Sequence, residues 1–153
     1  VSARHVMAPG FVGWVERLVD EAGLELGSIV LELTERTMLQ SGSVATRTLH
    51  TLRGAGCRIA IDDFGTGYSS LAYLRALPVD IIKIDRSFVA AAPKDRRDRA
   101  LLTTFVQLAD ALDLVVIAEG IETAEEADIV LETGCTLAQG YRLSRPSPEL
   151  GVR

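Results

Sequence analysis

The middle of the sequence reads Arg58-Ile-Ala-Ile-Asp62-Asp63-Phe-Gly65-Thr-Gly67-Tyr-Ser-Ser-Leu71, and this stretch decides the predicted fold. A short apolar run leads directly into two acids and then into a loop with two glycines. This pattern is typical of a buried strand that ends at a functional loop. Similar apolar runs, rich in Val and Ile and bounded by Gly, Asp or Pro, predict four more strands. They are Ile29–Leu33, Val79–Ile84, Leu114–Ala118 and Thr136–Ala138.

Amphipathic segments with helical spacing lie between these runs. They predict helices from about Pro9 to Gly23, over Ser43–Arg53, over Ser69–Ala76 and over Arg96–Leu112. A further helix is expected after Thr123, because Thr123 and Glu126 have the spacing of a capping box and Gly134 suits a helix end. Near-continuous apolar strands that alternate with helices predict an α/β fold with a parallel sheet covered by helices.

The composition is that of one soluble globular domain. The 153 residues include 16 Lys and Arg against 21 Asp and Glu, a net charge of −5, and 48% are apolar. This mild acidity argues against a protein that coats a nucleic-acid polymer, and no apolar run is long enough for a membrane span. Cys57 and Cys135 are too few for a disulfide framework, so we expect a reduced, cytoplasmic setting. The charge run Pro93–Arg99 is expected to be a solvated loop and helix start.

Polar or ionisable residues recur at the carboxyl ends of the predicted strands. In a barrel of parallel strands these ends meet on one face, where active sites are built. We therefore expect the side chains at these ends to converge. They are Glu32, Asp62, Asp63, Lys83, Glu119 and Gln139.

The alternation of side chains along a strand sets a condition on this site. Glu32 and Glu35 fall on opposite faces of one strand, and so do the neighbours Asp62 and Asp63. Both acids of a pair can reach one site only if the regular strand ends before the second acid. We expect the strands to end there.

A cluster of acids would repel itself and raise its own pKa values unless cations were bound. Ligands that are all oxygen favour Mg²⁺ or Mn²⁺ over zinc. Lys83, set among isoleucines, is either a cation inside this site or a lysine that extends from a half-exposed strand, and the neighbouring carboxylates favour the first. The glycine loop after Asp63 is either a mobile lid or an ordinary turn.

Five motifs taken together resemble the EAL domain, a family of bacterial phosphodiesterases that hydrolyse cyclic di-GMP to linear pGpG. The likeness covers essentially the whole chain, in the order of the family, and it implies a modified TIM-like (β/α) barrel. The motifs are Glu32-Leu-Thr-Glu35, Asp62-Asp63-Phe-Gly-Thr-Gly-Tyr-Ser-Ser-Leu71, Lys83-Ile-Asp-Arg-Ser-Phe88, Ala118-Glu-Gly-Ile-Glu-Thr123 and Gln139-Gly-Tyr141.

The resemblance also implies a role for each candidate residue. The implied ligands of a site for two Mg²⁺ or Mn²⁺ ions are Glu32, Asp62 and Asp63. The implied catalytic residues are Glu119 and Lys83, with Gln139 near the substrate and the attacking water. Glu35 matches the glutamate that anchors the mobile loop after Asp63.

The Glu-Ala-Leu motif that names the family does not occur in residues 1–153 and would lie upstream of Val1. Eight strands with their helices need about 250 residues, so we expect about six strands here. The chain is thus interpreted as the C-terminal portion of an EAL domain, a barrel incomplete at its N-terminus, and we expect it to be feebly active by itself. The resemblance further implies that cyclic di-GMP is the ligand and that the full domain forms a homodimer. It also implies upstream sensory or cyclase domains. The implied location is cytoplasmic, either as a free protein or as the cytoplasmic part of a membrane-anchored one.

Two alternatives stay open at this point. One is a non-catalytic receptor for cyclic di-GMP, although the acids and the loop motif that degenerate members lose are present here. The other is a metal-dependent barrel enzyme of the enolase type, with acids on successive strands and a lysine base. The Asp62–Gly67 loop makes the second alternative less favoured.

Overall fold

The computed structural model of the chain describes residues 1–40, 42–67 and 71–145. Five strands in these ranges form one parallel sheet with the order β1-β2-β3-β4-β5. About six strands were expected, and each of the five observed strands falls on a predicted apolar run. The strands are β1 (Val30–Thr34), β2 (Arg58–Phe64), β3 (Ile81–Ile84), β4 (Val115–Ala118) and β5 (Leu137–Ala138).

Helices connect the strands, as the alternating pattern predicted. They are α1 (Ala3–Val6), α2 (Phe11–Glu21), α3 (Glu35–Gln40), α4 (Gly42–Gly54), α5 (Leu71–Ala76), α6 (Arg86–Ala91), α7 (Arg96–Asp110) and α8 (Ala124–Glu132), with the 3₁₀ helix η1 (Leu26–Ser28) before β1. The helices α1, α3 and α6 were not predicted. Each has six residues or fewer, too few for helical periodicity to stand out. The expected start of α5 at Ser69 lies outside the described residues.

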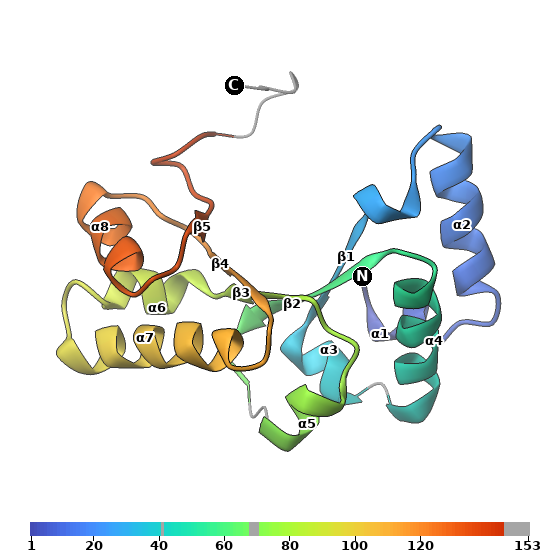
Figure 1. Cartoon of the computed structure of the whole chain (residues 1–153), viewed down its shortest axis with the longest axis horizontal. Coiled ribbons are helices and arrows are strands. Elements are labelled where there is room, and N and C mark those ends of the chain that lie inside the picture. Colours follow the sequence, from blue (N-terminus) through green and yellow to red (C-terminus); the bar gives the residue numbers. More distant parts are fainter. Residues whose placement is uncertain (41, 68–70, 146–153) are drawn as a thin grey trace.

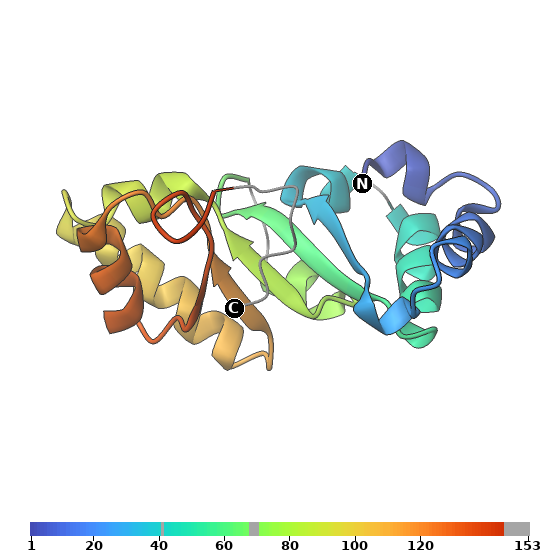
Figure 2. The ribbon, with the colours of Figure 1, turned by 90° about the horizontal axis from the view of Figure 1, so that it is seen from above.

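Most of the helices gather at two ends of the sheet, whereas α3 lies against β1 and β2 (Figure 1). Helices α6, α7 and α8 lie beside β3, β4 and β5, and α1, α2 and α4 lie at the other end beside β1. The view from above in Figure 2 shows the same separation, with the sheet between the two groups. One continuous apolar core joins them. Its most deeply buried members include Leu33, Leu52, Ile59, Ile84 and Leu102.

Two local predictions are confirmed at helix starts. Thr123 caps α8 and the side chain of Glu126 returns to the cap, which completes the capping box. The charge run from Pro93 enters α7 through Asp95, whose carboxylate accepts a hydrogen bond from Arg97 N. None of the helices within the described residues has the length and apolarity that a membrane crossing needs.

Candidate active site

The register of the sheet places the candidate side chains on one face. Thr34 pairs with Asp62, Ile61 with Ile82, and Lys83 with Ile117. Paired residues of parallel strands point to the same side, and the side alternates along each strand. One face therefore receives five of the predicted residues, within the last residues of the strands or just after them. They are Glu32, Asp62, Lys83, Glu119 and Gln139.

Lys83 lies at the centre of this group. Its Nζ is 2.9 Å from Glu32 Oε1, 3.3 Å from Asp62 Oδ1 and 2.7 Å from Glu119 Oε1. The lysine side chain is only 8% exposed, and its strand is otherwise made of buried isoleucines. Of the two interpretations of this lysine, the structure supports a cation that faces the carboxylates rather than one that extends to solvent.

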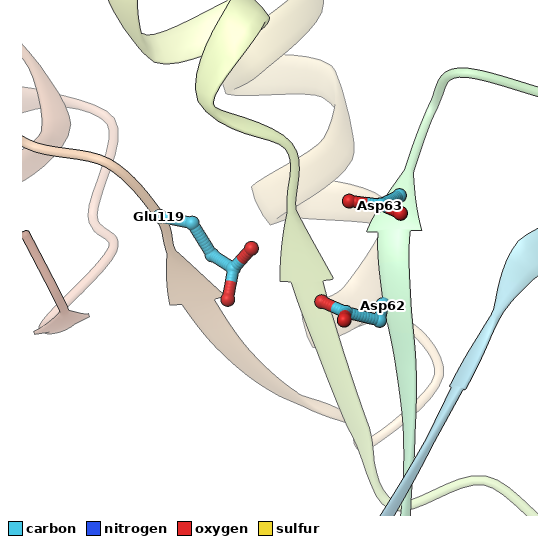
Figure 3. Close-up of side chains that lie close together, drawn as sticks. All are labelled: Asp62, Asp63 and Glu119. Carbon is cyan, nitrogen blue, oxygen red and sulfur yellow. The ribbon is translucent and has the colours of Figure 1, made fainter. Parts of the chain in front are cut away.

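Asp63 reaches the same site by a different route from the one expected. Strand β2 does not end at Asp62 but continues to Phe64, so alternation alone would turn Asp63 away. The register of β2 against β3 shifts between Ile61 and Phe64, and Asp63 has φ 54°, a left-handed conformation. This irregularity turns its carboxylate back toward Asp62 (Figure 3). Such bulges are common next to active sites because they redirect a side chain.

Three carboxylates form a compact cluster at this point. Asp62, Asp63 and Glu119 each offer an oxygen within 4.8 Å of the others, and Figure 3 shows them side by side from β2 and from the end of β4. Gln139 supports the third acid, because its Nε2 donates a 2.6 Å hydrogen bond to Glu119 Oε1. Glu32 contacts the cluster through Lys83.

Glu35 is held apart from the cluster and contacts the glycine loop. It follows the last residue of β1 and begins α3, as the alternation argument required. Its buried carboxylate accepts hydrogen bonds from Gly65 N at 3.0 Å and from Gly67 N at 3.2 Å. A Cβ on residue 67 would lie 2.7 Å from Glu35 Oε1, so glycine is needed for this approach. The expected loop residues Tyr68, Ser69 and Ser70 lie outside the described residues.

Burial and neighbouring charges shift the pKa values of Asp63, Glu119 and Lys83. Burial raises the pKa of Asp63, and the nearby charges of Asp62 and Asp85 raise it further. Burial also raises the pKa of Glu119, against the opposing effect of Lys83. For Lys83, burial lowers the pKa, but the hydrogen bonds to Glu119 and Glu32 outweigh it and raise the pKa above its usual value.

The residues present fit a divalent metal centre. The donors are all carboxylate oxygens, which suit hard cations such as Mg²⁺ and Mn²⁺. Asp62 Oδ1 is buried and accepts no hydrogen bond, although Lys83 Nζ faces it at 3.3 Å as an ion pair. Buried carboxylates need compensating charge, and here the one ammonium of Lys83 faces three acids, so a bound cation would supply the charge that the lysine does not.

Sequence reasoning missed two features beside the cluster. Asp85 was not selected, although it comes two residues after Lys83 and so alternates to the same face; its charge acts on Asp63. A hollow of about 520 Å³ also lies next to Gln139, lined in part by Arg86, Glu122, Tyr141 and Arg145. The guanidinium of Arg145 stands 5.7 Å from the centre of the Tyr141 ring.

The EAL domain model matches residues 1–146. The chain belongs to the EAL domain family. One relative, the cyclic di-GMP phosphodiesterase NbdA of Pseudomonas aeruginosa, is 42% identical over 146 residues, which cover 95% of this chain and 19% of NbdA. The chain spans about a fifth to a quarter of the length of several curated relatives.

Two solved EAL structures resemble this chain closely. A complex of the MucR phosphodiesterase with c-di-GMP superposes with a TM-score of 0.91 at 38% identity, over 97% of this chain and 60% of that one. MucR of Pseudomonas aeruginosa is named a bifunctional diguanylate cyclase and phosphodiesterase. A manganese and c-di-GMP complex of BlrP1 from Klebsiella pneumoniae has a TM-score of 0.83 at 34% identity, over 88% of this chain and 34% of that one. BlrP1 was also solved with calcium and c-di-GMP. The five-stranded parallel sheet is therefore part of the TIM-like barrel of an EAL domain.

Proposed function

We propose that the EAL domain containing this chain hydrolyses cyclic di-GMP to linear pGpG, with Mg²⁺ or Mn²⁺ held by its carboxylates. The observation that carries the proposal is the cluster of Asp62, Asp63 and Glu119 around a buried lysine at the strand ends. Membership of the EAL family and the likeness to a phosphodiesterase in complex with c-di-GMP support the choice of substrate.

In this proposal Glu32, Asp62 and Asp63 are the metal ligands contributed by the chain. Asp62 Oδ1 accepts no hydrogen bond and shares the charge of Lys83 with Glu32 and Glu119. Burial and neighbouring acids raise the pKa of Asp63. Both acids therefore carry charge that a metal ion would neutralise. The manganese complex of BlrP1 supports the type of cation. When bound, the ions supply charge neutralisation of the phosphate and a water that is more acidic than bulk water.

The remaining residues act on charge and protons. Lys83 would offset the negative charge that develops on the phosphate. Glu119, with its raised pKa and two hydrogen-bond donors on Oε1, would accept the proton of the attacking water. Gln139 would hold that glutamate and the water in place. In the reaction, the water oxygen bonds to phosphorus and the bond from phosphorus to O3′ breaks. The O3′ atom then takes a proton, which balances the one that Glu119 would accept from the water.

The glycine loop is proposed to cover the site, with Glu35 as its anchor. The two hydrogen bonds to Gly65 and Gly67 support this role, because they fix the start of the loop beside Asp63. Lids of this kind exclude water and complete a catalytic site.

The wider context is also a proposal. We propose that these 153 residues are the C-terminal portion of an EAL domain, and the match to only 60% of the MucR structure supports a partial domain. MucR is named as both a diguanylate cyclase and a phosphodiesterase, which supports the proposal that the protein containing this chain has further domains, such as a cyclase. By family resemblance we propose a homodimer of the complete domain and a cytoplasmic location.

The test is product analysis with the complete EAL domain, including the upstream Glu-Ala-Leu segment. Cyclic di-GMP and Mn²⁺ are incubated with the wild type and with Glu119→Gln, and the nucleotides are separated by chromatography. We expect pGpG from the wild type and a loss of about 1,000-fold in the variant, the range for a general base. Binding without turnover at saturating Mn²⁺ would contradict the proposal and favour a receptor.

A further inference from the structure

An aromatic cluster lies directly under the turn that carries Asp63. The ring of Phe105 on α7 meets Phe64 at 5.3 Å and Phe88 at 5.1 Å between ring centres, edge to face in both pairs. Phe64 ends β2, and Phe88 lies on α6. Three elements thus meet in one set of rings. Edge-to-face pairs of this kind add stability beyond the area that they bury.

Gly65 rests on this cluster. A Cβ on residue 65 would lie 2.7 Å from Phe88 Cε2 and 3.0 Å from Phe105 Cε2, so the backbone is in close contact with both rings. Gly65 has φ 96°, a conformation that favours glycine. The rings therefore limit the turn on one side, while Glu35 accepts the hydrogen bond from Gly65 N.

The constrained turn includes the strained acid. Asp63 has φ 54°, and both N and Oγ1 of Thr66 donate to its carbonyl oxygen, at 3.3 Å and 2.8 Å. A left-handed aspartate has a conformational cost and persists only where its surroundings hold it. Here the surroundings are the Thr66 hydrogen bonds, Glu35 and the rings of Phe88 and Phe105.

We propose that Phe88 and Phe105 are positioning residues that hold the Asp63–Gly65 turn in the conformation in which Asp63 joins Asp62 and Glu119. Neither ring is among the predicted site residues. The effect on the metal rests on the proposed function, because it requires Asp63 to be a ligand. The effect of the rings on the conformation of the turn is independent of the proposed function.

The first test measures hydrogen exchange of the Gly65 amide in the full chain by NMR without metal. The variants are Phe105→Leu and Phe88→Leu. The matched control is Phe11→Leu, which makes the same change at a buried site on α2, outside this cluster. We expect exchange at Gly65 to accelerate about tenfold or more in both variants and to stay within about twofold in the control. Thermal unfolding of all three measures their general stability.

The second test measures Mn²⁺ binding by electron paramagnetic resonance, with the same substitutions made in the complete EAL domain that includes the upstream Glu-Ala-Leu segment. We expect the dissociation constant to rise about fivefold or more in Phe105→Leu and Phe88→Leu and to stay unchanged in Phe11→Leu, even where the control loses as much thermal stability. Equal Gly65 exchange in Phe105→Leu and Phe11→Leu would overturn the proposal. If the wild type bound no Mn²⁺, the proposed metal ligands would be wrong, and the exchange result would still decide whether the rings hold the turn.

Discussion

Lys83 Nζ lies 2.7 Å from Glu119 Oε1, so an ammonium group from the centre of the sheet is hydrogen-bonded to the acid that follows β4. The same oxygen accepts the amide of Gln139. This oxygen is thus held by donors from β3 and from the end of β5. In the absence of metal, Lys83 supplies the positive charge that keeps the carboxylate cluster together.

Lys83→Met tests this role of the lysine. The methionine keeps most of the length and removes the charge that faces Glu32, Asp62 and Glu119. We expect the free energy of unfolding without metal to fall by about 2 kcal/mol, which is less than the roughly 3–5 kcal/mol of a fully buried broken pair because Glu32 stays partly in water. Turnover of the complete domain should fall about 100-fold. Urea unfolding and pGpG formation are the measurements, with the exposed Lys94→Met as control. Equal stability of the two variants would contradict the assignment.

Proton release should accompany metal binding. Burial raises the pKa of Asp63 and of Glu119, so both acids hold protons at pH values where ordinary carboxylates have lost them. The stability they give the metal-free chain is therefore fully present below their unfolded pKa values, about 4, and is lost as pH rises through the raised folded values. Metal binding must displace these protons.

We therefore expect Mn²⁺ affinity to weaken as pH falls, starting above the ordinary range of carboxylate pKa values. Calorimetry in buffers with different ionisation enthalpies measures the protons released. An affinity that stayed constant down to about pH 4 would show that neither acid has a raised pKa in the metal-free site.

Gly67→Ala tests the attachment of the loop to Glu35. The added Cβ would meet the carboxylate at 2.7 Å and must push the loop or the acid away. We expect turnover to fall at least about tenfold, the lower side of what misplacement costs, with little change in unfolding temperature. Gly54→Ala is the matched control, because its Cβ would meet nothing within 4 Å. Equal turnover in the two variants would mean that the anchor is dispensable.

Glu126→Gln tests the capping box of α8. The pH dependence expected here is opposite to that of Asp63 and Glu119, because the pKa of Glu126 is lowered. Burial raises the pKa of Glu126, but the backbone hydrogen bonds from Glu122 and Thr123 outweigh it and lower the pKa. The stability from its charge is therefore present above the unfolded pKa, about 4.3, and is lost as pH falls through the lowered folded value. At pH 7 we expect the free energy of unfolding of the variant to be lower by about 0.5 kcal/mol, and we expect this difference to disappear in acid. Urea unfolding at several pH values is the measurement. Glu125→Gln, in the same helical turn, should show a smaller effect.

Much of the site follows from the strand pattern alone. Glu32, Lys83 and Glu119 could be placed together because apolar runs ended in polar residues and parallel strands end on one face. The register of the sheet places them on a common side. Periodicity also predicted α2, α4 and α7, which are long enough to show an apolar face.

The remaining features depend on contacts between distant segments. Alternation would have turned Asp63 away from the site, and only the register shift and its left-handed backbone bring it in. The ring of Phe105, about forty residues later, supports this turn. Helix α6 was missed because it has six residues, although Asp85 and Ser87 form an N-cap that is visible in the sequence.

The central claim is that the carboxylates of this cluster hold the metal on which hydrolysis of cyclic di-GMP depends. The most direct measurement is the rate of pGpG formation against Mn²⁺ concentration, for the complete domain and for its Asp62→Asn variant. Asp62 is the test position because its buried Oδ1 accepts no hydrogen bond. We predict saturation in the wild type, and in the variant a half-saturating Mn²⁺ concentration raised at least about tenfold with a lower maximal rate. The same Mn²⁺ dependence in both proteins would contradict the account.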